Sequence, residues 1–188
     1  MSDVVRTALA TVVEGGTLSE EQAYAAMGQI MDGEATASQL AALLVALRMR
    51  GETVDELTGF ALVMRERVLR VAAPAGAIDV VGTGGDRSGT FNISTTAALV
   101  VAASGIPVAK HGNRAITSRS GSADVLDALG IRIDHDADSA AEALASDGFA
   151  FLFAPGFHPA MRHAGPTRLN AVRMPISRRV GPAWRIAG

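Results

Sequence analysis

Residues 79–95 read DVVGTGGDRSGTFNIST, and this stretch decides the fold. It begins inside a short apolar run, residues 77–82, which is typical of a buried parallel strand. Closely spaced glycines follow the strand, and a helix is expected to begin near Ser94. A strand, a glycine-rich turn and a helix in this order predict one βα unit of a parallel α/β sheet.

The same alternation continues downstream. We expect, in chain order, a helix over 95–105, a strand over 106–112, a helix over 122–130, a strand over 131–133, a helix capped by Ser139 with Glu142, and a strand over 149–155. Strands that alternate with helices of about ten residues indicate βαβ units. In such sheets ligands bind beyond the carboxyl ends of the strands, where the glycine-rich and polar segments of this chain fall.

The first seventy residues show helical spacing instead. We expect helices over 4–13, 19–31, 36–50 and 53–71. Three of them begin with a capping-box pattern, in which a Ser or Thr is followed three residues later by Gln or Glu: Ser19 with Gln22, Thr36 with Gln39, and Thr53 with Glu56. The sequence AAPAGA, residues 72–77, then breaks the helical pattern. We therefore predict a helical domain over 1–72, a partial α/β domain over 77–168 and a basic tail over 169–188.

The helix expected over 36–50 is apolar over most of its circumference, so it should be buried on more than one side. An internal bundle core and a dimer interface both account for this pattern.

Composition excludes several classes of protein. The chain has 188 residues, 48% of them hydrophobic and 19% charged, which suits one globular domain or one domain with a helical appendage. It has no cysteine, hence no disulfide and no thiol nucleophile. Aromatic residues make up 4% and the net charge is −2, so a general nucleic-acid or membrane surface is not expected. The N-terminus lacks a signal-peptide pattern, and we expect a soluble cytoplasmic protein.

The glycine-rich stretch indicates an anion site. Glycines let backbone N–H groups approach a phosphate closely, and the following helix N-terminus favours negative charge. Asn92 and nearby hydroxyls add side-chain donors, and Asp86 suits a sugar hydroxyl or a metal-bound water. The stretch is neither a Walker A loop nor a GxGxxG fingerprint. An ordinary glycine-rich turn is the alternative interpretation.

A second cluster follows the next strand. Lys110, the only lysine, opens the sequence KHGNR, and several Ser and Thr residues come after it. Lysine attracts phosphate through a compact positive charge, and arginine can donate two parallel hydrogen bonds to phosphate oxygens. A solvated loop is the alternative, but both segments end strands of one sheet and can face one ligand. Two such sites predict a ligand phosphorylated at both ends.

The motifs GTGGD, NIST, KHGNR and SGSAD, in this order and spacing, resemble the anthranilate phosphoribosyltransferase family of tryptophan biosynthesis. LSEEQAY and GEATASQLAALLVALRMRGET resemble the family's N-terminal helical domain, and FAPGFHPAMRHAGPTR resembles its segment near the aromatic substrate. The resemblance covers roughly residues 1–168. It implies an N-terminal helical domain followed by a parallel α/β domain of the nucleoside phosphorylase/phosphoribosyltransferase type, and a homodimer through the helices.

The resemblance also implies a reaction. The amine of anthranilate displaces diphosphate from 5-phosphoribosyl 1-diphosphate, with Mg²⁺ as cofactor. No general base is assigned; Lys110, Asn92 and Ser94 are expected to stabilise the leaving group. His135, which lies among acidic residues, is expected to be a surface residue rather than a ligand.

The resemblance assigns site residues by position. Those expected to bind 5-phosphoribosyl 1-diphosphate are Gly82, Gly85, Asp86, Thr90, Asn92, Ile93, Ser94, Thr95, Lys110, His111, Gly112, Asn113, Arg114, Ala115, Ile116, Thr117, Ser118 and Ser122. Those expected near anthranilate are Gly82, Asn113, Arg168 and His158. Ser94 is the expected magnesium ligand.

Family members continue well beyond residue 188, and the acidic pair of a second magnesium site has no counterpart here. We therefore expect impaired turnover by this chain alone, and a frameshift, a gene fragment and a shortened paralogue all account for the tail. One alternative is a non-catalytic protein that keeps dimerisation and ligand binding, and a minor one is a nucleoside phosphorylase. Six arginines after Asp147 allow a nucleic-acid contact as a weaker alternative.

Overall fold

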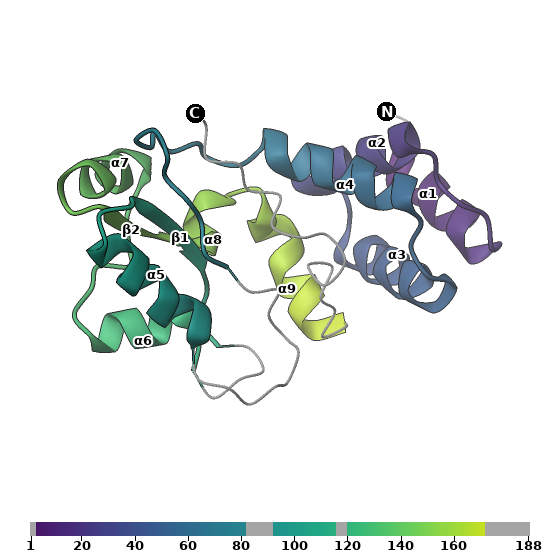
Figure 1. The fold of residues 1–188 in the computed structure, drawn as a ribbon. Coiled ribbons are helices and arrows are strands. Elements are labelled where there is room, and N and C mark those ends of the chain that lie inside the picture. Colours follow the sequence, from purple (N-terminus) through teal and green to yellow (C-terminus); the bar gives the residue numbers. More distant parts are fainter. Residues whose placement is uncertain (1–2, 82–91, 116–119, 172–188) are drawn as a thin grey trace. The chain divides into compact units, whose positions relative to one another are not determined.

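The computed structural model describes residues 3–81, 92–115 and 120–171, which form two compact units (Figure 1). The helical unit comprises residues 3–67 and 159–171, and the α/β unit comprises residues 68–158. Each unit has its own hydrophobic core.

The helical unit contains α1 (Val4–Val13), α2 (Glu20–Met31), α3 (Ala37–Arg50), α4 (Val54–Glu66) and α9 (Met161–Ala171). Helix α2 packs on α4, α1 packs on α2 and α3, and α9 returns late in the chain to pack on α2 and α3. Ala164 of α9 is buried in the same core as Leu40 and Leu44 of α3. Residues 159–168 therefore lie in the helical unit, whereas the sequence placed them in the α/β domain.

Capping boxes begin α2, α3 and α4, as predicted. The hydroxyls of Ser19, Thr36 and Thr53 accept from the N–H groups three residues on, at 3.2, 3.2 and 3.3 Å. The side chains three residues on accept in return from the cap N–H groups. These predictions are confirmed because every partner is local in sequence.

Helix α3 buries Leu40, Leu43, Leu44 and Leu47. Helices α1 and α9 both contact it, so much of its apolar surface is used inside the unit. Val45 and Met49 stay exposed.

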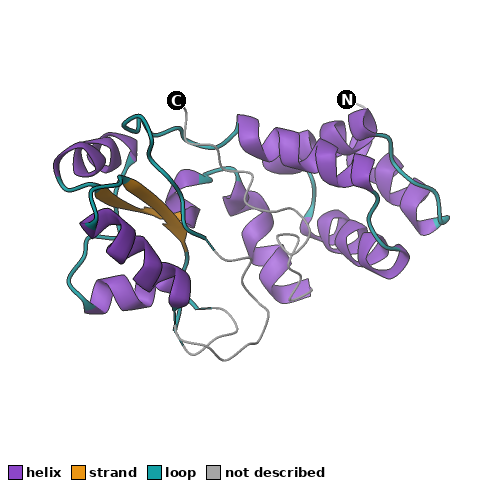
Figure 2. Cartoon of the chain, viewed as in Figure 1, coloured by secondary structure: helices purple, strands orange, loops and turns teal. Residues whose placement is uncertain are grey.

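The α/β unit contains α5 (Ile93–Ala103), β1 (Val108–Gly112), α6 (Ser122–Ala128), α7 (Ala137–Ser146), β2 (Phe149–Phe153) and α8 (Ala154–Phe157), coloured by type in Figure 2. Strands β1 and β2 are parallel, with Val108 opposite Phe149 and Gly112 opposite Phe153. The predicted parallel α/β class is confirmed.

The pleat of β2 explains the layers of this unit. Ala150 and Leu152 pack with Leu144 of α7 and Phe157 of α8, whereas Phe151 packs with Leu126 of α6. Since alternate side chains point to opposite faces, α7 and α8 cover one face of the sheet, and α5 and α6 lie on the other (Figure 1).

Three predicted elements differ in the α/β unit. The strand expected over 77–82 is reduced, in its described part, to a bridge between Ile78 and Val108. Residues 131–133 form no strand, because the Ile131 N–H donates to Leu126 O at 2.9 Å and so closes α6. The helix expected from Ser139 begins earlier: Asp136 is its cap and accepts from the Ser139 N–H at 2.8 Å.

The fourth helix also ends earlier than its predicted limit at residue 71. Helix α4 stops at Glu66, and beyond it the Leu69 N–H donates to Phe157 O at 3.0 Å while Val71 enters the α/β core. Helices α8 and α9 were not predicted. Within the described residues, no helix is both long enough and apolar enough to cross a membrane.

Candidate functional site

The first turn of α5 carries a buried hydroxyl. Thr95 is 1% exposed, and its Oγ1 has no hydrogen-bond partner among the described residues. The Asn92 carbonyl accepts from the N–H groups of Thr95 and Thr96, both at 3.0 Å, and begins the helix without a side-chain cap. An uncapped helix N-terminus with a desolvated hydroxyl suits an anion.

Asn92 connects this turn to the second motif. Its Nδ2 donates to Ser120 O at 3.3 Å, so the start of α5 lies beside the loop that follows β1. The contact joins the NIST segment to Ser120 of the SGSAD segment, which lies in the loop between β1 and α6.

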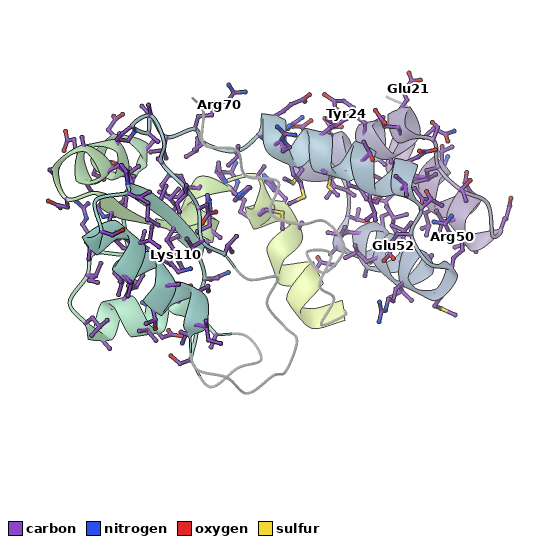
Figure 3. The ribbon with its side chains drawn as sticks, in the orientation of Figure 1. Glu21, Tyr24, Arg50, Glu52, Arg70 and Lys110 are labelled. Carbon is purple, nitrogen blue, oxygen red and sulfur yellow. The ribbon has the colours of Figure 1, made fainter. Side chains whose placement is uncertain are left out.

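Lys110, labelled in Figure 3, is almost completely buried on β1, with 1% exposure. Its Nζ donates to the Val80 carbonyl at 2.7 Å, two residues before the glycine-rich stretch. Burial lowers the pKa of Lys110, and the nearby Asp79 carboxylate opposes that shift.

Asp79 also holds His111. Its Oδ1 accepts from the His111 backbone N–H at 3.2 Å, and its Oδ2 lies 3.4 Å from His111 Nδ1. The His111 ring meets Phe157 edge-on, with centroids 6.3 Å apart. Nothing in the motif pattern singled out Asp79, although an acidic residue inside an apolar strand is a signal that could have done so.

His158 lies near His111 in the same unit and is 4% exposed. Burial, with a smaller contribution from His111, lowers the pKa of His158 from 6.5 to about 4. The two imidazole rings therefore lie close to each other: His111 is part of β1, and His158 directly follows α8.

Two glycines let the loop after β1 fold tightly. A Cβ on Gly112 would meet the Phe151 ring at 2.6 Å and also Ser122 Oγ. A Cβ on Gly121 would lie 2.6 Å from Asn113 O, so backbone segments touch at this point. Ser122 Oγ donates to Asn113 O at 3.4 Å.

Asp124 of α6 accepts several hydrogen bonds from the loop between β1 and α6. Its Oδ2 accepts from the N–H groups of Ala115 and Gly121 at 2.9 and 2.8 Å, and its Oδ1 accepts from Arg114 at 3.0 Å. Arg114 also reaches Asp127 at 3.1 Å. The two backbone N–H groups, followed by Arg114, lower the pKa of Asp124. Arg114, expected to grip phosphate, is in this structure engaged with α6, and Asp124 is a residue that the sequence reasoning missed.

The remaining predicted site residues lie on different elements or outside the described residues. Ile93 and Ser94 stand in the first turn of α5, whereas Arg168 belongs to α9 of the helical unit. Several predicted site positions lie outside the described residues, namely Gly82, Gly85, Asp86, Thr90, Ile116, Thr117, Ser118 and the side chain of Arg168.

A hollow of about 570 Å³ lies elsewhere in the α/β unit, lined by Leu99 of α5, Ile131, His135, Glu142 of α7 and Phe149 among others. None of its lining residues belongs to the motifs, so it is separate from this site. His135 is part-buried there, which lowers its pKa. The described residues contain no cluster of three or more His, Asp or Glu that could hold a metal ion by itself.

The Ser94 hydroxyl fits Mg²⁺ only together with an anion. A single hydroxyl oxygen on the first turn of a helix is a poor cation site by itself, because the helix N-terminus carries positive potential. Mg²⁺ is commonly held by one or two protein oxygens together with substrate phosphates, and this donor set matches that mode.

Comparison with known proteins agrees with this geometry. Residues 6–68 match the model described as "Glycosyl transferase family, helical bundle domain", and residues 75–182 match "Glycosyl transferase family, a/b domain". The second match extends past Arg168 into the basic tail.

Relatives and solved structures carry one activity in their names. Anthranilate phosphoribosyltransferase of Bradyrhizobium sp. strain BTAi1 is 53% identical over the whole chain, which covers 56% of that relative. The crystal structure of this enzyme from Thermus thermophilus superposes with a TM-score of 0.82 at 47% identity, over 94% of this chain and 54% of that one. The Saccharomyces cerevisiae enzyme in complex with PRPP and Mg gives 0.83 at 25% identity, over 97% and 55%.

The chain thus spans about half the length of the curated relatives it matches. More than half of its residues fall within the a/b-domain match, and the adjoining helical-bundle match accounts for most of the others. The chain belongs to the glycosyl transferase family that has this helical bundle domain and this a/b domain.

Proposed function

We propose that this chain contributes the diphosphate-binding part of an anthranilate phosphoribosyltransferase. The observation that carries the proposal is the pairing of the α5 N-terminus, with its buried Thr95 hydroxyl, and the loop after Lys110 through the Asn92–Ser120 hydrogen bond. The relatives' names support the choice of substrates, 5-phosphoribosyl 1-diphosphate and anthranilate.

In the proposed reaction, the amine nitrogen of anthranilate forms a bond to C1 of the ribose. The C1–O bond to diphosphate breaks, and the amine releases a proton. Negative charge grows on the leaving diphosphate, so groups that stabilise it lower the barrier. Lys110 and the N–H groups of the α5 first turn are the described groups that suit this task.

Ser94 would hold Mg²⁺ together with diphosphate oxygens. The ion would supply further charge neutralisation for the leaving group. The protein's own contribution is the oxygen of Ser94 and the dipole of α5, which place the phosphate at this end of the sheet.

For the aromatic substrate we propose Gly82, Asn113, Arg168 and His158, as the resemblance implies. The depressed pKa of His158 supports a neutral imidazole near pH 7, which can accept or donate one hydrogen bond without adding charge. Arg168 would pair with the carboxylate of anthranilate.

Calorimetry with Mg²⁺ and 5-phosphoribosyl 1-diphosphate tests the binding site. Thr95→Val should weaken binding about tenfold, because it removes a hydroxyl from a site that is already desolvated. Thr58→Val is the matched control, since Thr58 lies on α4 and its hydroxyl donates to Val54 O. Equal binding by wild type and Thr95→Val would contradict the proposed location.

A fluorescence assay for anthranilate consumption tests the activity. The full-length Bradyrhizobium relative serves as the reference, and we expect much slower turnover by the 188-residue chain. Diphosphate-ester binding without turnover would support a binding role for this chain alone. Phosphate-dependent cleavage of a nucleoside would overturn the assignment in favour of a phosphorylase.

We also propose a homodimer through the helical unit. Met49 at the end of α3 and Val54 at the start of α4 are 84% and 78% exposed, and exposed apolar side chains of this kind can mark an interaction surface. Sedimentation velocity at micromolar concentration should show a dimer that Met49→Asp weakens. Leu129→Asp, which changes an exposed apolar residue of the α/β unit, should leave it intact.

A further inference from the structure

Residues 78–80 pair with β1 first through backbone hydrogen bonds and then through hydrogen bonds that involve side chains. The Ile78 N–H donates to Pro107 O at 3.0 Å, and the Ala109 N–H donates to Ile78 O at 2.9 Å, as in a parallel ladder. The next rung would join the His111 N–H to the Val80 carbonyl. The His111 N–H instead donates to Asp79 Oδ1 at 3.2 Å.

The carbonyl released from the ladder takes a different donor. Val80 O accepts from Lys110 Nζ at 2.7 Å. The Asp79 carboxylate therefore accepts the hydrogen bond of a β1 backbone N–H group. The Val80 carbonyl, in turn, accepts the hydrogen bond of the buried Lys110 ammonium. This arrangement lets the 78–80 segment leave the sheet while Lys110 stays anchored beside it.

The second oxygen of Asp79 faces the imidazole. Asp79 Oδ2 lies 3.4 Å from His111 Nδ1, and both side chains are largely buried, at 13% and 11% exposure. A carboxylate at Nδ1 favours the tautomer with the proton on Nδ1, so the lone pair is on Nε2. Asp79 is thus in contact with His111 and within electrostatic reach of Lys110.

We propose that Asp79 is a positioning residue that sets the His111 tautomer and anchors the Lys110–His111 pair of the diphosphate site. The inference rests on the proposed function, because it gives the pair its ligand. The inference goes beyond the proposed function because it assigns a role to Asp79, which is not among the predicted site residues. Asp79 need not touch the substrate; it acts through its two neighbours.

Charge makes the same residue important for Lys110. Burial favours loss of the Lys110 proton, and Asp79 opposes that loss. The described charged or titratable groups near this end of β1 also include His111, His158, Arg114 and Asp124. The histidines supply no fixed negative charge and the Asp124 carboxylate is paired with Arg114, whereas Asp79 acts on Lys110 directly.

The test compares Asp79→Asn and Asp79→Ala with the wild-type chain, and Asp134→Asn is the control. Asp134 carries an equivalent carboxylate that is 82% exposed and paired with Arg132. Asn keeps an oxygen that can accept from the His111 N–H but loses the charge, whereas Ala loses both. The chain has four histidines, so ¹⁵N-histidine spectra can be assigned by single substitutions.

Two readouts separate positioning from general damage. The first is the His111 tautomer in the ligand-free protein, which we expect to be Nδ1–H in wild type and Asp134→Asn and mixed in Asp79→Asn. The second is binding of 5-phosphoribosyl 1-diphosphate with Mg²⁺, which should weaken at least tenfold in Asp79→Asn while the helical circular dichroism is unchanged. Asp79→Ala should show both effects and also a lower midpoint of urea unfolding.

The outcomes are distinguishable from failure of the proposed function. No binding by wild type overturns the proposed ligand, and the tautomer readout then decides the role of Asp79 by itself. An unchanged tautomer in Asp79→Asn overturns the inference. Wild-type affinity in Asp79→Asn overturns it as well, even when the tautomer changes.

Discussion

The carboxylate of Glu56 accepts a hydrogen bond at 2.9 Å from the backbone N–H of Leu18, 38 residues earlier in the chain. The same side chain, which is fully buried, accepts from the Thr53 N–H at 2.8 Å and from Arg50 at 2.5 Å. A helix cap at the start of α4 therefore also fixes the turn that enters α2. Arg50 extends the link by donating to Gly16 O at 3.0 Å.

Glu56→Ala should lower the free energy of unfolding by about 3–5 kcal/mol, because it leaves Arg50 and two N–H groups without their acceptor. Glu56→Gln should cost less, since one amide oxygen remains. Urea unfolding followed by helical circular dichroism measures both. A cost below about 1 kcal/mol for the Ala variant, which is typical of exposed ion pairs, would contradict the buried network.

The same network predicts a dependence on pH. Burial alone raises the pKa of Glu56, but hydrogen bonds from Arg50, Leu18 and Thr53 hold it below its usual value of 4.5. A carboxyl with a lowered folded-state pKa contributes stability that is present above pH 4.5 and lost as pH falls through the folded value. Unfolding midpoints between pH 7 and 3 should fall in wild type and change less in Glu56→Gln.

Gly59→Ala should destabilise the helical unit by about 1–3 kcal/mol or more through overpacking. A Cβ there would lie 2.8 Å from Tyr24 N and 2.9 Å from Ala23 Cβ, where α4 crosses α2. Gly28→Ala is the matched control: it is inside α2, and its Cβ would have nothing within 4 Å. We expect it to be neutral or to stabilise by up to about 1 kcal/mol. Similar melting curves for the two variants would refute the close crossing.

Lys110→Met should separate binding from folding. Lys110→Met removes a buried charge, which is favourable, but it also leaves the Val80 carbonyl without its donor, so the two effects on the unfolding free energy oppose each other. Binding of Mg²⁺ and 5-phosphoribosyl 1-diphosphate should nonetheless weaken at least tenfold, since a charged hydrogen bond contributes roughly 1.5–3 kcal/mol.

Because the chain has one lysine, ¹⁵N-lysine labelling gives one side-chain signal, whose titration should fall below 10.5. A pKa lowered in the folded state makes the fold more stable above the unfolded value and less stable as pH falls through the folded one. A Lys110 signal that titrates at or above 10.5 would contradict its burial.

His158 should stay neutral down to about pH 4. Its lowered pKa means that stability present above pH 6.5 is lost as pH falls toward 4, by about 3 kcal/mol in total. Proton NMR of the ring Hε1 signals gives the midpoint directly, with His158→Gln for assignment. A midpoint near 6.5 would show that the ring is solvated.

The starts of helices illustrate what a local pattern can and cannot decide. Ser19, Thr36 and Thr53 were predicted as caps and are caps, because both partners lie within three residues. Ser139 was predicted as a cap and is instead the third residue of α7, bonded to Asp136. Asp136 with Ser139 and Ser139 with Glu142 are competing local patterns, and the structure uses the first.

The candidate anion site shows the same division. The motif residues Asn92 and Thr95 lie at the start of α5, and Lys110 and His111 lie in β1. Spacing could not reveal that Arg114 pairs with Asp124 and Asp127, or that Asp79 replaces a backbone acceptor. The first contact depends on how the loop after β1 folds back onto α6, and the second depends on the register between residues 78–80 and β1.

The sequence by itself determined the helical start and the parallel α/β class, and it singled out the glycine-rich and KHGNR segments, because hydrophobic period, capping residues and glycine spacing act over a few neighbours. Only the tertiary structure decided that α9 returns to the helical unit and that the first strand gives way to the Asp79–His111 and Val80–Lys110 bonds. In both cases the free energy comes from burial and hydrogen bonding between segments distant in the chain. A local sequence pattern does not identify such distant partners.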